Sequence, residues 1–356
     1  MTALLGPVLV VGTGLVGTSI ALACRRAGLE VLLSDVSPRH VRTASGLGAG
    51  RPFAVADVPQ LVVVAVPPDH LGRAVTQALV ETEAVVTDVG SVKTAPFHEI
   101  ESAVGPARLP RYVGSHPMAG SERSGPLAAT DSLFDGRPWA VTPHATADPA
   151  ATALVEALAV ACGAAVVRLS PEEHDQAVAR ISHLPHLLSV LVAGQLAEAP
   201  ATHLALAGQG VRDVTRIAGS DPVMWKQIVG ANAAALLALL GDVRDQLDEL
   251  MSAISDGERD ALGALLDRGV AGSRAIPGKH GGPAREMGTV FVSVPDHPGE
   301  LARLFADAGA SGVNIEDVHI DHDPARDTGL VELLVAEVSA QHLTTSLESR
   351  GWVTHR

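Results

Sequence analysis

Three glycines near the start of the chain constrain the fold more than any other feature of the sequence. Gly12, Gly14 and Gly17 form the pattern G-x-G-x-x-G between the apolar run PVLVVG and the Ala-rich segment IALACRRAG, which leads into a second apolar run, LEVLLSD. Glycine at this spacing permits a tight turn, close approach of a phosphate to the backbone, and close packing of a helix on a strand. Residues 7–36 therefore predict a strand–loop–helix–strand unit that binds a dinucleotide pyrophosphate at the helix N-terminus.

An acidic residue after the second apolar run indicates which dinucleotide is bound. Asp35 lies 18 residues after Gly17. A carboxylate there accepts a hydrogen bond from the ribose 2′-OH of NAD and repels the 2′-phosphate of NADP. Arg39 and His40 follow and would soften that repulsion, so NADP stays open as the less favoured cofactor. The expected cofactor contacts are Gly12, Gly14, Leu15, Val16, Gly17, Asp35, Val66 and Asp88.

Short apolar strands continue to alternate with helical segments up to residue 169. The runs LVVVAV (61–66) and AVVTDV (84–89) each precede a helical segment, and further strands are expected at 111–116, 138–143 and 164–170. This alternation predicts a parallel sheet covered by helices on both faces. We expect residues 1–169 to form one α/β domain.

The pattern changes twice after this domain. Over residues 170–270, Ala- and Leu-rich helical periodicity predicts an all-α domain. Its long stretch at 222–268 predicts one helix or a helix pair and indicates an interlocked dimer core. Residues 271–286 are rich in Gly, Pro and charge and predict an exposed linker. Residues 287–356 show a βαββαβ pattern, which predicts a ferredoxin-like domain.

Composition excludes several classes of partner. The chain has 26 Lys and Arg against 40 Asp and Glu, a formal charge of −14, which argues against binding to nucleic acid or to a membrane surface. Its two cysteines, Cys24 and Cys162, lie in apolar contexts and fit a reducing compartment. The N-terminus runs into the glycine loop without a basic region or a cleavage site. We expect a soluble, cytoplasmic protein.

Two polar segments follow predicted strands, where open α/β sheets place their ligands. DVGSVK (88–93) offers Ser91 and Lys93, although a serine there could simply cap the next helix. GSHPMAGSERSG (114–125) contains His116, held extended by the proline that follows it. An imidazole suits the removal of a hydroxyl proton while hydride leaves the same carbon.

Two further segments fall in the predicted helical domain. HDQAVARISHLPH (174–186) places His183 and His186 three residues apart on one helix; no HExxH spacing or cysteine set supports zinc, so no metal is expected. Downstream, Arg212 and Arg216 share a helix face and suit a carboxylate clamp, unless they pair with nearby aspartates. Trp225 follows as a candidate for lining the site.

These motifs, in this order, resemble the prephenate/arogenate dehydrogenase family. GTGLVGTS, DVGSVK, GSHPMAGSERSG, HDQAVARISHLPH and TRIAGSDPVMW carry the resemblance over residues 8–270. It implies a Rossmann-type NAD-binding domain, a helical dimerisation domain, and the oxidation of prephenate by NAD to 4-hydroxyphenylpyruvate, carbon dioxide and NADH. Such chemistry requires a correctly positioned substrate, one general base and side chains that bind the anionic groups of the substrate.

The resemblance also implies roles for individual residues. His116 would take the C4 hydroxyl proton, and Ser91 would bind that hydroxyl and orient the histidine. Arg216 would bind a substrate carboxylate, and Trp225 would reach the site from its own or the other subunit. The remaining implied substrate contacts are Ser182 and His186 at the pyruvyl side chain, with His183, Ser121 and Glu122 nearby; Glu122 and Asp175 would be supporting or gating groups.

The C-terminal segment resembles an ACT regulatory domain. The resemblance rests on VPDHPGELARLF followed by NIEDVHI, and it implies feedback control by tyrosine or another aromatic amino acid. The implied effector contacts are Asp296, Gly299, Asn314 and Ile315. A purely structural or dimerising domain is the alternative.

Three other functions stay open from the sequence. Arogenate dehydrogenase has the same fold and chemistry. The neutral Asn232 slightly favours prephenate over arogenate, whereas the acidic Glu122 keeps the choice open. A β-hydroxyacid dehydrogenase would use a lysine in the helical domain, but the chain has no lysine between Lys93 and Lys226. A non-catalytic sensor of NAD and amino acids would not require His116, Arg216 and the Ser182–His186 pair together.

Overall fold

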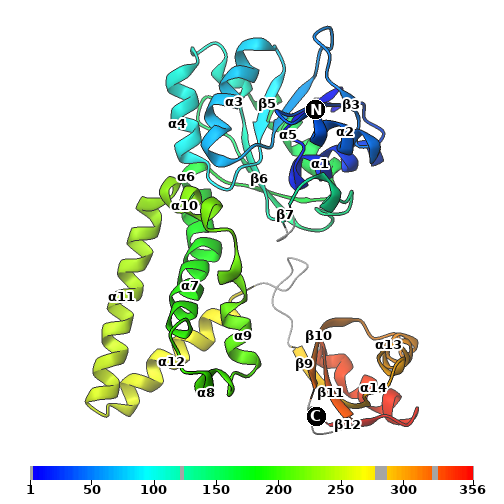
Figure 1. The fold of residues 1–356 in the computed structure, drawn as a ribbon, viewed down its shortest axis with the longest axis vertical. Helices are drawn as coiled ribbons and strands as arrows, with labels where there is room; N and C mark the ends of the chain where they lie inside the picture. Colours follow the sequence, from blue (N-terminus) through cyan, green and yellow to red (C-terminus); the bar gives the residue numbers. More distant parts are fainter. Residues whose placement is uncertain (1–2, 121–123, 277–286, 323–327, 356) are drawn as a thin grey trace. The chain divides into compact units, whose positions relative to one another are not determined.

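A computed structural model describes residues 3–120, 124–276, 287–322 and 328–355. The chain divides into two compact units, residues 1–249 and 250–356, and each is considered by itself. Figure 1 shows the course of the chain through both units.

A five-stranded parallel sheet forms the centre of the first unit. Its strand order is β3-β2-β1-β4-β5, and the side chains of β1 alternate between two hydrophobic clusters, Val8 and Val10 in one and Leu9 in the other. Burial of both faces is what a parallel sheet with helical crossovers requires. The elements are β1 (Val8–Val11), α1 (Leu15–Arg26), β2 (Val31–Ser34), α2 (Pro38–Gly46), β3 (Arg51–Pro52), β4 (Leu61–Val64), α3 (Pro68–Glu81), β5 (Val85–Asp88) and α4 (Thr94–Ala103).

A three-stranded sheet extends this domain. It contains β6 (Gly114–Pro117), β7 (Pro138–Thr142) and β8 (Ala165–Arg168), with α5 (Pro149–Ala161) between the last two. A single bridge between Val86 and Tyr112 links the approach to β6 with β5. The strand positions agree with the sequence prediction, but β6 runs antiparallel to β7, so the domain is not parallel throughout.

Helices then replace strands, as the periodicity predicts. A capping box between Ser170 and Glu173, with Pro171 in the first turn, starts the first helix of this region. The helices are α6 (Pro171–Val178), a π-helical turn (Ala179–His183), α7 (Leu184–Leu196), α8 (Ala201–Leu204), α9 (Gln209–Thr215), a 3-10 turn (Arg216–Gly219), α10 (Pro222–Ala231), α11 (Ala233–Ser255) and α12 (Arg259–Arg274). Helices α10 and α11 meet at Asn232 with a bend of 93°.

Length and composition alone would let the stretch Pro171–Leu196 cross a membrane, a property it shares with core helices of soluble proteins. That stretch carries His174 and Asp175, which are buried and bonded to other parts of the first unit. Helix α12 continues to Arg274, into the stretch predicted as linker, and residues 277–286 of that stretch lie outside the described residues.

The end of the chain forms the ferredoxin-like fold expected from its pattern. The elements are β9 (Met287–Pro295), α13 (Glu300–Ala310), β10 (Ile315–His322), β11 (Thr328–Ala336), α14 (Glu337–Glu348) and β12 (Val353–His355), with antiparallel strand order β10-β11-β9-β12. Every second residue of β9 is buried, from Gly288 to Val294. Val290, Val292 and Val294 pack there with Leu304 and Leu343 from the two helices.

Candidate active site

The glycine loop after β1 has the shape that the sequence predicts. Gly12 has φ of +95°, and a Cβ there would lie 2.3 Å from the carbonyl oxygen of Ala65. A Cβ on Gly17 would lie 1.9 Å from the carbonyl oxygen of Gly12, so any larger residue would push α1 off the loop. A Cβ on Gly14 would meet nothing within 4 Å. That open side, at the N-terminus of α1, is where a pyrophosphate fits.

Asp35 lies beside this loop at the end of β2. Its carboxylate accepts hydrogen bonds from the Thr13 backbone N–H (2.6 Å), the Thr13 hydroxyl (2.9 Å) and the Ser37 N–H (2.8 Å). His40 Nδ1 lies 3.8 Å from the same carboxylate, whereas Arg39 is exposed. The carboxylate is thus fixed next to the loop, in the place that suits a ribose of NAD.

The other predicted cofactor contacts divide into two groups. Leu15 and Val16 are half-buried in the first turn of α1, and Val66 follows β4 with its side chain against Gly12. Asp88 is different, because it is fully buried and is hydrogen-bonded to the Gly90 N–H and the Tyr112 hydroxyl, each at 2.8 Å, and to the ammonium of Lys93. The prediction that Asp88 contacts the cofactor is therefore not supported by its position.

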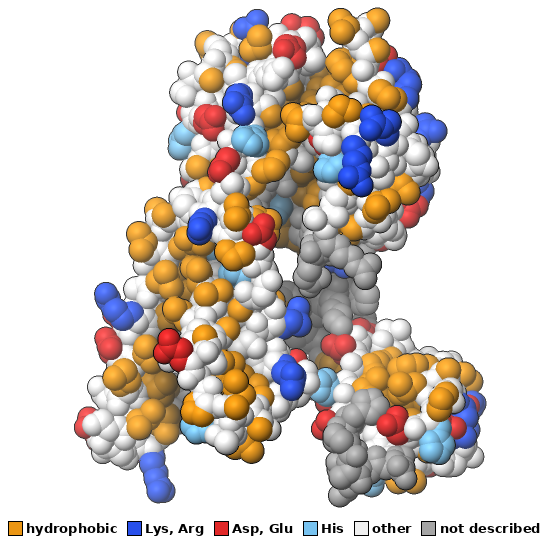
Figure 2. Space-filling model, in the orientation of Figure 1, with side chains coloured by type: hydrophobic (Ala, Val, Ile, Leu, Met, Phe, Trp, Pro, Cys, Tyr) orange, Lys and Arg blue, Asp and Glu red, His pale blue; other side chains and the backbone are white. Residues whose placement is uncertain are grey.

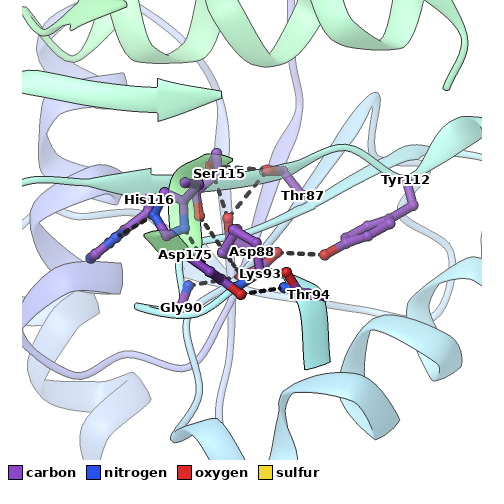
Figure 3. A network of polar contacts seen from close by, with 10 residues as sticks. Thr87, Asp88, Gly90, Lys93, Thr94, Tyr112, Ser115, His116 and Asp175 are labelled. Atoms are coloured by element: carbon purple, nitrogen blue, oxygen red, sulfur yellow. Dashed lines mark hydrogen bonds and ion pairs between the residues drawn. The ribbon is translucent and has the colours of Figure 1, made fainter. Parts of the chain in front are cut away.

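Asp88 instead belongs to a buried polar network beneath the site (Figure 3). Lys93 is 1% exposed, and its ammonium donates to Asp88 and, over 2.7 Å, to the carbonyl oxygen of Ser115. Ser115 precedes His116 on β6, and its hydroxyl donates to the Asp88 carbonyl oxygen at 2.8 Å. This network ties the strand that carries His116 to the end of β5.

His116 is the first member of a hydrogen-bonded row of three side chains. Its Nδ1 lies 3.0 Å from Nε2 of His174, and Nδ1 of His174 lies 2.9 Å from Oδ1 of Asp175. The ionised carboxylate can only accept, so Nδ1 of a neutral His174 carries the proton and its Nε2 accepts from His116. The proton of neutral His116 is then on Nδ1, which leaves Nε2 as an unprotonated base.

The N-terminus of α4 holds the far end of this row. The backbone N–H groups of Lys93 and Thr94 each donate to the Asp175 carboxylate over 2.8 Å. Charge-assisted bonds from a helix N-terminus favour the ionised carboxylate, and bonds from His174 and Thr94 lower the pKa of Asp175 against the opposing effect of burial. Asp175 therefore stays an acceptor at neutral pH.

A second histidine pair lies on the helical stretch, as the i,i+3 spacing predicts. His183 ends the π-helical turn, and His186 lies in the first turn of α7; both are buried. Trp225 of the same chain stacks on His186, with ring centroids 3.4 Å apart and planes 3° from parallel, and meets His183 edge-on at 6.0 Å.

Asn232 contacts His183, one of the two histidines of this pair. It is buried, and its amide nitrogen lies 2.8 Å from the Asp175 carbonyl oxygen and 3.2 Å from Nδ1 of His183. The suggestion that Asn232 selects the side chain of the substrate is not supported, since both of its amide protons serve these internal acceptors.

Ser91 and the predicted anion-binding residues lie nearer the surface. Ser91 lines a cavity of about 190 Å³ together with Asp69 and Gln227, whose side chains are bonded to each other at 2.5 Å. The described residues show no hydrogen bond between Ser91 and His116; His174 occupies that orienting position. Ser182 is exposed in the π-helical turn, and Arg216 is exposed at the start of the turn that packs on α7.

Two predicted substrate contacts, Ser121 and Glu122, lie outside the described residues. Within the part of the chain that the structure describes, no group of three His, Cys, Asp or Glu side chains is arranged to hold a metal ion.

Burial keeps the histidines of the site neutral. It lowers the pKa of His116 well below the usual imidazole value, an effect to which positive charge on His174 and Lys93 would add. Burial also lowers the pKa of His174 and of His186, and it lowers the pKa of His183 to about 4. At neutral pH the arrangement offers an uncharged base at His116 and uncharged imidazoles around it.

Sequence reasoning missed the role of His174 and gave Asp175 only a supporting or gating one. The only local signal was the pair His174–Asp175 directly after a capping box, which places both residues on a buried turn of helix. The connection of His174 to His116 spans 58 residues and depends on packing of α6 against β7, the strand that pairs with β6.

Comparison with known proteins shows which family the chain resembles. Residues 20–168 match the profile "Prephenate dehydrogenase, nucleotide-binding domain", and residues 170–268 match "Prephenate dehydrogenase, dimerization domain". The chain is 37% identical to a probable prephenate dehydrogenase of Streptomyces niveus, over 96% of this chain and 98% of that one.

Solved structures show the same likeness. A crystal structure of prephenate dehydrogenase from Aquifex aeolicus, in complex with hydroxyphenyl propionate and NAD+, is 28% identical with a TM-score of 0.69 and covers 77% of this chain and 99% of that one. A crystal structure of Synechocystis arogenate dehydrogenase is 27% identical with a TM-score of 0.67 and covers 75% of this chain and 98% of that one.

Proposed function

The chain belongs to the prephenate dehydrogenase family, and from that premise we propose that it oxidises prephenate with NAD, yielding 4-hydroxyphenylpyruvate and carbon dioxide. The observation that carries the proposal is the row His116–His174–Asp175, which leaves an unprotonated nitrogen on His116. NAD, held by the glycine loop and Asp35, supplies the acceptor for the hydride that leaves the hydroxyl-bearing ring carbon.

His116 moves the one proton that the reaction requires. Nε2 takes the proton of the C4 hydroxyl as the carbon loses hydride, and a ring ketone forms. The bond to the ring carboxylate then breaks, its electron pair restores aromaticity, and carbon dioxide leaves. The phenolate oxygen recovers the proton from His116, so the histidine ends the cycle neutral, as its lowered pKa favours.

The helical region supplies the groups that bind an anionic substrate. We assign Arg216 to a substrate carboxylate, and Ser182 and His186 to the pyruvyl side chain. Stacking on Trp225 fixes the His186 ring and limits its rotation. Local cations and donors of this kind let a chain with a net charge of −14 hold a dianion.

Replacing the base tests the proposal. His116→Asn is expected to reduce kcat for NADH formation from prephenate by about 100- to 10 000-fold, the usual contribution of a positioned acid–base group, while NAD binding measured by fluorescence is retained. His98→Asn, at an exposed imidazole on α4, is the matched control and should keep full activity. Undiminished turnover in His116→Asn would refute the assignment of the base.

Arogenate is the alternative substrate, because the likeness extends to the Synechocystis arogenate dehydrogenase. It differs from prephenate in carrying an ammonium in place of the side-chain ketone. The discriminating measurement is kcat/KM for both substrates with NAD, followed at 340 nm. NADH formed from neither substrate would refute both readings.

We propose that the chain assembles as a homodimer through its helical region and that it is a cytoplasmic protein. Residues 170–268 match the dimerization profile, and large apolar side chains are exposed on this region in the single chain (Figure 2), among them Leu191 (62%), Leu206 (85%) and Leu237 (70%). Exposed apolar surface of this kind is typical of an interface. Cys24 and Cys162 are buried and free, as in a reducing compartment.

We further propose that the C-terminal domain binds an aromatic amino acid that controls activity. Gly299, in a left-handed conformation with φ of +98°, is the N-cap of α13 and follows the loop containing Asp296, and Asn314 directly precedes β10 at Ile315. In the full-length protein, tyrosine is expected to change NADH formation, and Asn314→Ala to weaken that response without changing the rate in its absence. A rate unaffected by tyrosine, phenylalanine or tryptophan would contradict a regulatory role.

A further inference from the structure

Asn232 lies where three parts of the site meet. It separates α10 from α11 at their 93° bend, and its side chain is 5% exposed. Its amide nitrogen is shared between the carbonyl oxygen of Asp175 on α6 (2.8 Å) and Nδ1 of His183 at the end of the π-helical turn (3.2 Å). A residue that merely ended a helix would not need two buried side-chain contacts to separate elements.

The chemistry of these contacts fixes the proton on His183. The Asp175 carbonyl oxygen can only accept, so the amide NH2 of Asn232, and not its oxygen, faces this side. The second amide proton then points to Nδ1 of His183, which must accept it. A neutral His183 therefore carries its proton on Nε2.

The geometry points to Asn232 as a positioning residue that holds His183 in the Nε2–H form, as a hydrogen-bond donor to a carboxylate or carbonyl oxygen of the anionic substrate. This inference rests on the proposed function for the identity of the substrate. His183 and His116 thereby have opposite roles, because one presents a donor at Nε2 and the other an acceptor.

Burial supports the same assignment. His183 is 2% exposed and its pKa is lowered to about 4, so the ring is neutral at physiological pH and its tautomer decides whether it donates or accepts. The ionisable groups near it are Asp175 and His174 on α6, His186 on α7 and His116 on β6. Among them only Asp175 favours a charged His183.

The tautomer can be measured directly in the full-length protein. With 15N-labelled histidine, and His183→Gln to assign the signals, we expect Nδ1 of His183 to have the shift of an unprotonated nitrogen and Nε2 that of a protonated one. The near-isosteric Asn232→Asp replaces the donor by an acceptor, and is expected to move the proton to Nδ1. A wild-type His183 protonated at Nδ1 would overturn the inference whether or not any variant folds.

Kinetics test the role toward substrate. Asn232→Asp should raise KM for prephenate by about 10- to 100-fold, the loss of one hydrogen bond to a charged group, with kcat changed much less. Lowering the pH should reduce this increase, because the carboxylate introduced at position 232 raises the pKa of His183 and a doubly protonated His183 donates again. Gln77→Glu, an exposed amide-to-acid change on α3, should leave KM unchanged.

The outcomes separate this inference from the proposed function. A moved proton with unchanged KM would show that His183 does not contact the substrate and would overturn the substrate half of the inference. No NADH from prephenate or arogenate in the wild type would refute the proposed function, whereas the NMR measurement would still decide the role of Asn232.

Discussion

His174 uses both ring nitrogens inside the protein, one toward His116 and one toward Asp175. A side chain placed in this way acts through another residue and determines which nitrogen of the base is free. Loss of the correct tautomer of a catalytic histidine is costly even where its position is kept. His174 is therefore expected to affect the rate and not the binding of substrate.

A pair of substitutions tests this expectation. His174→Phe removes the acceptor for His116 Nδ1–H and should lower kcat by about 100-fold, with KM for prephenate and for NAD nearly unchanged. His174→Gln offers an amide oxygen as acceptor and should recover part of the loss. Equal effects of the two substitutions, or an effect on KM alone, would contradict a role in orienting the base.

Local motifs predicted some site residues and could not predict their partners. His116 is recognisable because a strand, a glycine-rich loop and a following proline surround it in the sequence. The partners of Asn232 could not be predicted because its neighbours in the chain are alanines, while its contacts are with His183 and Asp175, at 49 and 57 residues' distance. Such contacts depend on how helices pack, which residue order alone does not specify.

Element positions followed from sequence wherever the hydrophobic period was clear. Strands such as β1 and β4 of the main sheet are apolar runs, and β9 shows a strict alternation of buried positions. The strand β3 escaped prediction because it consists of only Arg51 and Pro52, both exposed. Its pairing with β2 depends on its position and not on an apolar pattern.

Two irregular helical elements were also beyond sequence reasoning. The π-helical turn Ala179–His183 lies within a run of helix-forming residues, and its wider turn precedes the buried His186. The sequence of residues 222–268 predicts one helix or a helix pair and does not place a bend at Asn232. Both irregularities occur at residues of the candidate site. There the placement of polar groups overrides the local preference of the sequence for a regular α-helix.

At the scale of the whole molecule, the neutral histidines make stability depend on pH. Burial lowers the pKa of His116, His174, His183, His186 and His144. In the unfolded chain an imidazole titrates near 6.5. Below that pH the unfolded state binds more protons than the folded state, so the free energy of unfolding falls as the pH falls.

The pH range of this loss follows from the pKa values of the histidines in the folded protein. For His183 the loss begins near pH 6.5 and continues to about pH 4, its folded pKa. Each fully neutral buried histidine can contribute a slope of up to about 1.4 kcal/mol per pH unit in that range. Carboxylates with a lowered pKa, such as Asp57 at about 2, lose their contribution mainly below this window.

Urea unfolding at pH 7.5, 6.5 and 5.5, at one protein concentration because a dimer is expected, measures this dependence. The free energy of unfolding should change little from pH 7.5 to 6.5 and fall steeply from pH 6.5 to 5.5. His183→Gln should show a shallower fall than the wild type, whereas His98→Gln, at an exposed position, should show the same slope. A wild-type stability that stays constant down to pH 5.5 would mean that these imidazoles titrate in the folded protein as they do in the unfolded chain, which would contradict the lowering of their pKa by burial.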